Sequence, residues 1–218
     1  AFAGDGSRLY VTSLASDRIG VVNPATGVLV TRRPTVPGPT GVVVDDMHGR
    51  IYVVGRYHNE LQALSTATLQ QVSRTGIGFD PTPDAIVNGR KFLYSGFTSA
   101  HGDQACASCH LFGDMDDLAW DLGNPSGQYG PPPPNMDDPF LVGADPMKGP
   151  MTTQTLQDIV GKEPLHWRGD RDGLEEFNGA FIGLQGDDTN LTAQEMQEFE
   201  NFLSSIHFPP NPYRNLDN

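Results

Sequence analysis

Hydrophobic and polar residues alternate in short runs over the first 96 positions of the chain. These runs are rich in Val, Ile, Leu and Tyr, and stretches such as 23–27 and 45–50, which hold Asn, Asp, Pro and Gly, separate them. Alternation with a period of two predicts β-strands, and the polar stretches between the runs predict turns. We therefore expect residues 1–96 to form a series of short β-strands.

The strand pattern repeats at a constant offset. Residues 9–11 return as residues 51–53, and residues 19–22 return as residues 61–64. A unit of about 40–45 residues that holds several strands is typical of the blades of a β-propeller. We expect about two such blades.

A third copy of the repeat is expected to begin near residue 81. Pro81-Thr82 repeats Pro39-Thr40, and Gly89-Arg90 leads into residues 92–94 much as Gly49-Arg50 leads into residues 51–53. The strand pattern is thus predicted to continue as far as residue 96.

These repeats resemble the YVTN family of β-propellers, in which a Tyr-Val strand is followed by a strand that ends in Asn/Asp-x-Ala-Thr-Gly, as at residues 23–27. The resemblance covers roughly the first 95 residues. It implies a propeller, which needs about four to eight blades to close. We expect the missing blades to come from a longer polypeptide or from another subunit, and we favour the longer polypeptide because residues 1–6 align with the middle of a repeat.

The pattern changes at about residue 98. The β-alternation stops there, and residues 98–103 predict the start of a helix ahead of the cysteines. Residues 122–150 are rich in Gly and Pro and predict a long irregular loop. Near the end of the chain, Thr192 and Glu195 form a capping box that predicts an amphipathic helix, which Pro209 and Pro210 stop.

The two cysteines lie three positions apart in Cys106-Ala107-Ser108-Cys109-His110. Covalent attachment of haem needs two thiols that can each add to a vinyl group of one porphyrin, and a histidine directly after the second cysteine that can reach the iron. The Cys-x-x-Cys-His pattern supplies both. It predicts one haem c, bound through Cys106 and Cys109, with His110 as an iron ligand.

Three other interpretations compete with haem. A thioredoxin-like redox pair would lie in a βαβ unit, and no such unit surrounds Cys106. A structural zinc site would need further Cys or His at paired spacing, whereas His101, His166 and His207 are not paired in this way. A disulfide across two intervening residues would be strained.

Residues 97–208 resemble the cytochrome c domain that is often fused to YVTN-type propellers. The resemblance rests on residues 97–99, 106–110, 120–125 and 149–156. It implies a mainly α-helical, class I-like cytochrome c domain over residues 97–208, which follows the partial propeller of residues 1–96 and precedes a tail at 209–218. The expected fold class is therefore α+β with several domains.

A looser resemblance links residues 155–170 to the Thr-Leu-Arg and aromatic-His-Asp-Gly stretch of dihaem cytochrome c peroxidases. The chain departs from that family in two respects. It has a single Cys-x-x-Cys-His, and residues 174–181, where those enzymes carry their distal methionine, contain no Met.

The second axial ligand of the iron is predicted to be Met151, with His166 and Met147 as alternatives. Met151 lies far beyond His110 in the sequence, at the end of the Pro-rich loop. Met196 falls on the apolar face of the last helix and is expected in the core, whereas Met115 is too close to His110 in the sequence. Met47, Met136 and the remaining histidines complete the set of candidates.

Three further side chains are expected at the haem. Trp120 and Trp167 would pack on or near the porphyrin, because burial of so large a group requires aromatic area. Arg168 could pair with a haem propionate, since a guanidinium forks onto a carboxylate. Ordinary core or surface roles compete with each of these assignments. The acidic residues that follow the motif, from Asp114 to Asp121, are expected to form a solvated face.

The formal charge of −13 and the pI near 4.6 argue against a nucleic-acid partner. A basic redox protein would be the electrostatic complement, and acidity that only keeps the protein in solution explains the charge equally well. No run of apolar residues is long enough to span a membrane. Because haem is attached in this way outside the cytoplasm, the expected location is periplasmic or extracellular.

Two functions fit these observations best. The first is an electron-transfer c-type cytochrome with His/Met ligation, attached to a propeller scaffold. The second is an enzyme, either of the dihaem peroxidase type or a propeller oxidoreductase that passes electrons to this haem. A purely structural propeller would leave the two cysteines and His110 without a role.

Overall fold

The computed structural model describes residues 1–122 and 149–214. The chain divides into two compact units. One comprises Ala1–Phe97 with His101–Gln104, and the other comprises Thr98–Ala100 with the chain from Ala105 onward. The fold is mixed, with antiparallel sheets and few helices in the described ranges. Met136 and Met147, and most of the predicted loop at 122–150, lie outside the described residues.

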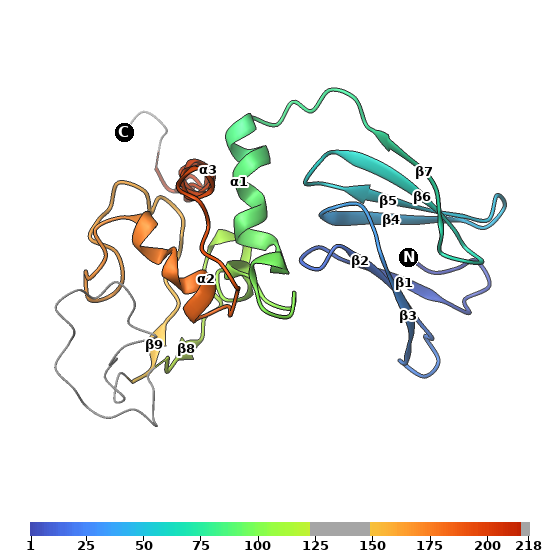
Figure 1. The fold of residues 1–218 in the computed structure, drawn as a ribbon, viewed down its shortest axis with the longest axis horizontal. Helices are drawn as coiled ribbons and strands as arrows, with labels where there is room; N and C mark the ends of the chain where they lie inside the picture. Colours follow the sequence, from blue (N-terminus) through green and yellow to red (C-terminus); the bar gives the residue numbers. More distant parts are fainter. Residues whose placement is uncertain (123–148, 215–218) are drawn as a thin grey trace. The chain divides into compact units, whose positions relative to one another are not determined.

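Two antiparallel sheets make up most of the first unit (Figure 1). In each of them the strands follow one another in sequence order, and the β4–β7 sheet lies over the β1–β3 sheet. The three-stranded sheet contains β1 (Leu9–Ser13), β2 (Arg18–Val22) and β3 (Leu29–Pro34). The four-stranded sheet contains β4 (Pro39–Asp45), β5 (Arg50–Gly55), β6 (Glu60–Ser65) and β7 (Gln71–Gly76).

The backbone follows the same repeat as the sequence. Asp17 and Asn59, which occupy equivalent positions in the two copies, both adopt the left-handed conformation, with φ of 50° and 52°. The carbonyl of Asp17 accepts a hydrogen bond from the amide of Thr35, and the carbonyl of Asn59 accepts one from Ile77, both at 2.9 Å. Strands β1–β3 are therefore the structural counterparts of β5–β7.

One hydrophobic core joins the two sheets. Tyr10, Ile19 and Val21 of the first sheet are buried together with Ile51, Val53 and Leu64 of the second, and Val36 and Leu69 complete the cluster. Buried apolar area of this kind is the main source of stability in an antiparallel sandwich.

The expected third copy of the repeat is wrong, because residues 84–94 form a helix, α1 (Asp84–Tyr94). Pro81 and Pro83 have no amide hydrogen for a strand ladder, which disfavours a strand at this point. Asp84 in the first turn and Lys91 in the last turn complement the helix dipole. The pattern of residues 92–94, which matched a strand, instead places Phe92 and Leu93 on the buried side of α1.

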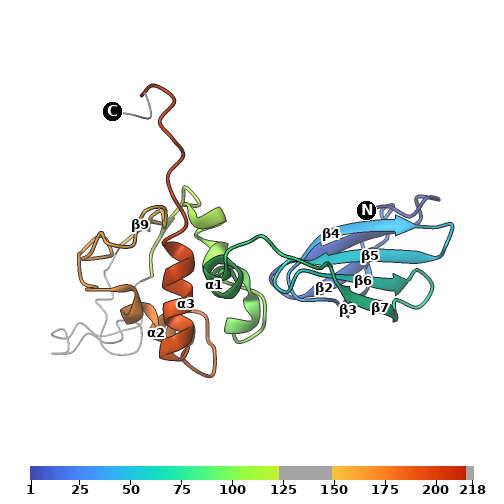
Figure 2. The same ribbon diagram turned by 90° about the horizontal axis from the view of Figure 1, so that it is seen from above.

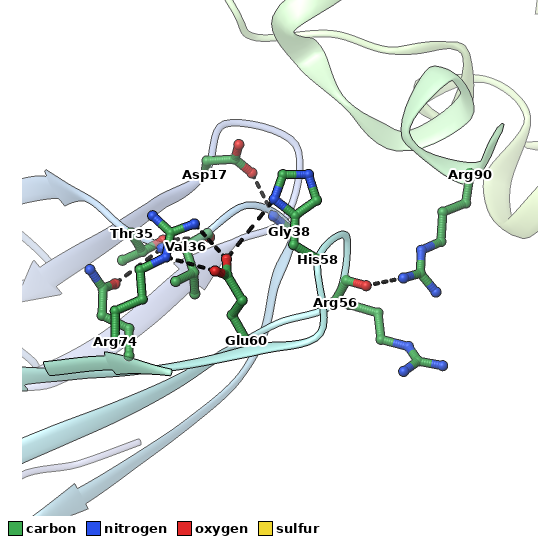
Figure 3. A network of polar contacts seen from close by, with 10 residues as sticks. Asp17, Thr35, Val36, Gly38, Arg56, His58, Glu60, Arg74 and Arg90 are labelled. Atoms are coloured by element: carbon green, nitrogen blue, oxygen red, sulfur yellow. Dashed lines mark hydrogen bonds and ion pairs between the residues drawn. The ribbon is translucent and has the colours of Figure 1, made fainter. Parts of the chain in front are cut away.

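A polar network lies within the first unit, where the turns of the two sheets and α1 meet (Figure 3). The amide of Gly38 donates a 2.7 Å hydrogen bond to the Asp17 carboxylate, whose pKa is raised by burial. Arg90 of α1 donates to the carbonyl of Arg56. This bond attaches α1 to the β5–β6 turn.

The described residues of the second unit contain little regular structure, so the mainly α-helical character expected for residues 97–208 is confirmed only in part (Figure 2). Its α-helices in the described ranges are α2 (Gly179–Gly183) and α3 (Ala193–Leu203). Single 3₁₀ turns occur at Cys106–Ser108, Leu111–Gly113 and Leu174–Phe177, and β8 (Ala119–Trp120) pairs with β9 (Met151–Thr152).

The helix start expected at residues 98–103 is also wrong. Gly102, with φ of 65°, takes a left-handed conformation that does not continue a helix. The first helical turn beyond this point is the short one at Cys106–Ser108.

The predicted C-terminal helix is confirmed as α3. The Thr192 hydroxyl accepts from the amide of Glu195 at 3.2 Å, and the Glu195 carboxylate accepts from the amide of Thr192 at 2.9 Å. Met196 and Phe199 are buried on its apolar face, so Met196 is a core residue, as predicted. No helix in residues 1–122 or 149–214 is long and apolar enough to cross a membrane.

Candidate functional site

The Cys-x-x-Cys-His motif lies on one tight turn. The amide of His110 donates to the carbonyl of Cys106 at 2.9 Å, and the Ser108 hydroxyl accepts from the amide of Ala105 at 3.0 Å. These bonds keep the two cysteines and His110 within one turn of chain. Both cysteines are free thiols, which disfavours the disulfide interpretation.

The backbone carbonyl of Gln154 holds the imidazole of His110. The His110 Nδ1 atom lies 2.8 Å from that carbonyl oxygen. Because a carbonyl can only accept, Nδ1 must carry the proton, and Nε2 therefore has the lone pair. Burial lowers the pKa of His110 and favours the neutral ring. A neutral imidazole whose Nδ1–H is fixed by a carbonyl is the usual state of a metal-binding histidine.

The two thiols lie in surroundings that disfavour the thiolate. Burial raises the pKa of Cys106 to about 11, although Gln185 Nε2 donates to its sulfur at 3.3 Å. The pKa of Cys109 is also raised, by burial and then by the nearby charge of Asp116. A reactive redox pair needs the opposite shift. Within the described ranges, no group of three or more Cys, His, Asp or Glu could hold a metal ion. The raised pKa values of the two thiols disfavour the redox-pair interpretation.

Asp116 connects the motif with the segment that follows it. Its carboxylate accepts from the indole nitrogen of Trp120 at 2.8 Å and from the amide of Leu118 at 3.1 Å. Its charge also acts on His110 and Cys109. Trp120 is 42% exposed. An apolar ring held at the surface by its polar edge is available to cover a large ligand.

Met151 lies beside this segment. It is half-buried in β9 and pairs directly with Trp120 of β8. The amide of Thr153 donates to the carbonyl of Leu118 at 3.3 Å. Met151 is therefore attached to the stretch that directly follows His110, three residues before Gln154.

His166 is oriented by a carboxylate. Its Nδ1 atom lies 2.8 Å from Asp170, which also forms an ion pair with Arg168 at 3.0 Å. The ring contacts Phe177 edge-on, and the backbone of His166 takes a left-handed conformation with φ of 65°. A non-glycine residue in this conformation is strained, and such strain is concentrated at functional sites.

Trp167, the neighbour of His166, is 60% exposed. Its indole nitrogen donates to the carbonyl of Thr152 at 2.8 Å. The loop that carries His166 is thereby connected to β9, and through Gln154 to His110. The structure thus pairs Met151 with Trp120 and joins Trp167 to Thr152, the neighbour of Met151.

The other methionine and histidine candidates lie in different surroundings. Met47 is exposed in the first unit, and Met115 is exposed close to the motif. His207 is bound to Asp158 at 2.7 Å.

Sequence reasoning gave no role to Gln154 or Gln185, because only the fold brings them to Cys106–His110. It expected Asp116 only as part of a solvated acidic face, whereas its carboxylate binds Trp120 and the amide of Leu118.

The negative charge of the chain lies in its C-terminal part. Residues 98–218 contain 20 of the 27 acidic residues and 5 of the 14 basic ones, a formal charge of −15. Residues 1–97 contain 7 acidic and 9 basic residues, a formal charge of +2. The part with the Cys-x-x-Cys-His motif is therefore strongly acidic.

No protein-family model matches the chain, and no curated protein sequence matches it significantly. Among solved structures, the chain is similar to the Kuenenia stuttgartiensis hydrazine synthase, with 16% identity and a TM-score of 0.34 over 35% of this chain and 22% of that one. It is also similar to apo AztD from Citrobacter koseri, with 14% identity and a TM-score of 0.32 over 37% of this chain and 23% of that one. The alignments thus span less than a quarter of each of these two proteins.

Proposed function

We propose that the second unit is a c-type cytochrome module that carries one covalently bound haem and transfers electrons. The observation that carries this proposal is the geometry of His110. Its Nδ1 atom is held 2.8 Å from a backbone carbonyl within a turn that also presents two free thiols. These are the groups that covalent haem attachment and axial ligation require.

The roles of the three residues follow from their chemistry. Cys106 and Cys109 would hold the haem covalently, because each thiol can add its S–H across one vinyl group to form a thioether without an oxidant. His110 would supply Nε2 to the iron. The bound haem supplies an iron that accepts and releases one electron, while the protein sets the ligands and controls access to them. Cys106 and His110 are half-buried, so part of each side chain is accessible to a large apolar group.

Met151 and His166 are the described residues that could supply a second ligand, and either would need enough chain to reach past a haem held by His110. The Gln154 carbonyl lies behind the His110 ring, and Met151 is three residues from Gln154. Three extended residues span only about 10 Å, which leaves little chain to pass round a porphyrin. This short connection disfavours Met151, the ligand expected from the sequence.

His166 has a longer connection, because it lies much further along the chain from Gln154 than Met151 does. The bond between its Nδ1 atom and Asp170 resembles the carboxylate–histidine pairs that orient metal ligands. We therefore propose His166 as the second ligand, with Met151 and Met147 as the alternatives. Trp120 and Trp167 supply aromatic area for the porphyrin. Arg168 is already paired with Asp170, so contact with a propionate would require it to share or leave that carboxylate.

The acidity of residues 98–218 supports a basic redox protein as partner, because complementary charge speeds diffusional encounter. The covalent haem supports a periplasmic or extracellular location. Both statements depend on the presence of the haem.

Intact-mass measurement under denaturing conditions tests the proposal. The protein is produced in a host that attaches haem c, and its mass is compared with the 23.6 kDa of the polypeptide. We expect an excess of one haem that survives denaturation and is lost in Cys106→Ala/Cys109→Ala. A mass equal to that of the bare polypeptide would overturn the proposal. A high-spin ferric spectrum that reacts with peroxide would instead support a peroxidase-like enzyme.

A further inference from the structure

The side chain of Gln185 lies against the sulfur of Cys106. Gln185 lies just beyond α2 and is only 7% exposed. Its Nε2 atom donates to Cys106 Sγ at 3.3 Å, and its Oε1 atom accepts a longer hydrogen bond, of 3.4 Å, from the Thr98 hydroxyl. An amide nitrogen can only donate, and an amide oxygen can only accept. The two partners therefore orient the amide with its N–H toward the sulfur.

The backbone of Gln185 is fixed from two directions. Its amide donates to the carbonyl of Ala180 in α2 at 3.0 Å, and its carbonyl accepts from the amide of Ala100 at 3.1 Å. The next residue, Gly186, has φ of 74°, and a Cβ atom there would lie 3.1 Å from the Cβ atom of Ala100. The chain therefore packs closely at this point, and the side chain of Gln185 has little freedom to turn away from Cys106.

A glutamine at this position is poorly explained by stability alone. Burial of an amide costs free energy unless it is hydrogen-bonded, and a thiol sulfur is a weak acceptor. An apolar side chain of similar length, such as methionine, would fill the space without that cost. The N–H directed at the sulfur therefore points to a role in the chemistry of Cys106.

The two cysteine sulfurs have different electrostatic surroundings. Cys106 receives a hydrogen bond from a neutral amide, whereas Cys109 lies within range of the negative charge of Asp116. Under the proposed function, Cys106 is one of the two residues that would join the polypeptide to the haem. A donor on a sulfur draws electron density from the group to which that sulfur is bonded. Hydrogen bonds around a redox centre are among the means by which a protein sets the reduction potential.

We propose that Gln185 is a positioning residue that keeps its N–H on the Cys106 sulfur in the holoprotein and thereby raises the reduction potential of the haem. The sign follows from the charge that reduction adds. The reduced centre is more negative by one electron, and the positive end of the amide dipole stabilises the more negative state, most strongly where water is excluded. This inference rests on the proposed function, because it requires a thioether at Cys106.

An optical redox titration of the holoprotein tests the inference. Gln185→Met keeps the length of the side chain and removes the donor. We expect a negative shift of the potential, so that the ratio of ferrous to ferric haem at a fixed solution potential falls roughly 2- to 10-fold, the range that loss of one hydrogen bond gives. Gln194→Met, the same substitution at an exposed glutamine of α3, is the control and should leave the potential unchanged. Equal potentials of the two variants would overturn the inference.

A double-mutant cycle separates an effect through the sulfur from a general loosening of the fold. In a Cys106→Ala background, in which Cys109 alone would hold the haem, Gln185→Met should no longer shift the potential. An equal shift in both backgrounds would contradict a role through Cys106. If Cys106→Ala retains no haem, Gln185→Glu takes its place, because a carboxylate lacks the N–H and adds negative charge. Its potential should lie below that of Gln185→Met, and a potential at or above that value would overturn the inference.

Intact mass, measured on every protein compared, distinguishes this inference from the proposed function, and circular dichroism shows that each is folded. A bare polypeptide mass for the unsubstituted chain would overturn both. One haem in the unsubstituted chain, with no difference in potential between Gln185→Met and Gln194→Met, would overturn the role of Gln185 and leave the proposed function in place.

Discussion

The imidazole Nδ1 of His110 lies 2.8 Å from the backbone carbonyl oxygen of Gln154, a residue 44 positions further along the chain. This single bond fixes which ring nitrogen of His110 can coordinate a metal. It also places Gln154 next to His110, so the distance along the chain from Gln154 limits which residues could reach the far side of the proposed haem.

Substitution of the two candidate second ligands should have different effects on the ferric holoprotein. His166→Ala should open a coordination position and convert a low-spin spectrum into a high-spin one, because the imidazole held by Asp170 is removed. Met151→Ala should leave the spectrum low-spin. His207→Ala is the matched control, since His207 is also bound to an aspartate through Nδ1. A near-infrared thioether band that is lost in Met151→Ala would show that Met151 is the ligand.

Gly55→Ala should destabilise the second sheet. A Cβ atom at residue 55 would lie 2.7 Å from the carbonyl oxygen of Pro37 and 2.7 Å from the Val36 side chain. Overpacking of this kind costs about 1–3 kcal/mol. Gly76, which also ends a strand, has open space around its Cβ position, so Gly76→Ala should stay within about 0.5 kcal/mol. Urea titrations followed by circular dichroism measure both. Equal effects would contradict the predicted clash.

Removal of the capping box should weaken α3. Thr192→Ala deletes the hydroxyl that accepts from the amide of Glu195, and loss of such a cap costs about 1 kcal/mol. Thr189→Ala changes an exposed threonine before the helix and serves as the control. Chemical denaturation compares the two. A Thr192 variant as stable as the Thr189 variant would show that the cap contributes little.

The contact between Asp158 and the segment that follows α3 should make stability depend on pH. The amide of Phe208, and then His207, lower the pKa of Asp158 in the folded protein. A carboxylate with a lowered pKa stabilises the fold above its unfolded value of 3.8, and this contribution is lost as the pH falls through the folded value. The urea midpoint of Asp158→Asn should therefore fall below that of the unsubstituted chain at neutral pH. The difference should shrink in acid, and Asp188→Asn, at an exposed aspartate, is the control for loss of a carboxylate charge.

Electron exchange with a basic redox protein should slow as salt is added, because salt screens the charge of residues 98–218. Stopped-flow measurements at several ionic strengths test this expectation. Asp117→Asn, close to the motif, should reduce the rate at low salt more than Asp5→Asn does in the first unit. Rates that are independent of salt, or equal effects of both substitutions, would contradict electrostatic guidance toward the motif.

Local signals in the sequence predicted the parts of the fold that depend on local chemistry. The repeat is present in the strands and in the turns at Asp17 and Asn59, and the box of Thr192 and Glu195 starts α3 as expected. The strand predicted at residues 92–94 was wrong, because three consecutive apolar residues fit a strand or a helix equally well. The prolines that precede them disfavour the strand.

The candidate site around Cys106–His110 was predictable only where its residues are neighbours in the sequence. Cys106, Cys109 and His110 are neighbours in the sequence, so their spacing alone indicates the chemistry. Gln154 and Gln185 act on them through a backbone carbonyl and a buried amide from distant parts of the chain. No residue type or spacing identifies such partners before the fold is known. For the same reason, the sequence does not show that Met151 lies closer along the chain than His166 to the residue that holds His110.

The two sheets of the first unit contact each other through different sides, one lined by Tyr10, Ile19 and Val21 and the other by Ile51, Val53 and Leu64. This difference bears on how many such sheets can stack on one another. A contact between two identical surfaces occupies both of them, so such an assembly stops at two members. In a contact between different surfaces, as here, each further sheet would cover one side and expose a side of the same kind. The contact alone therefore does not limit the number of sheets. The number of sheets is instead limited by the angle between successive sheets, because this angle determines whether the last sheet contacts the first and closes a ring. The angle, and not the chemistry of one contact, therefore sets the number of sheets.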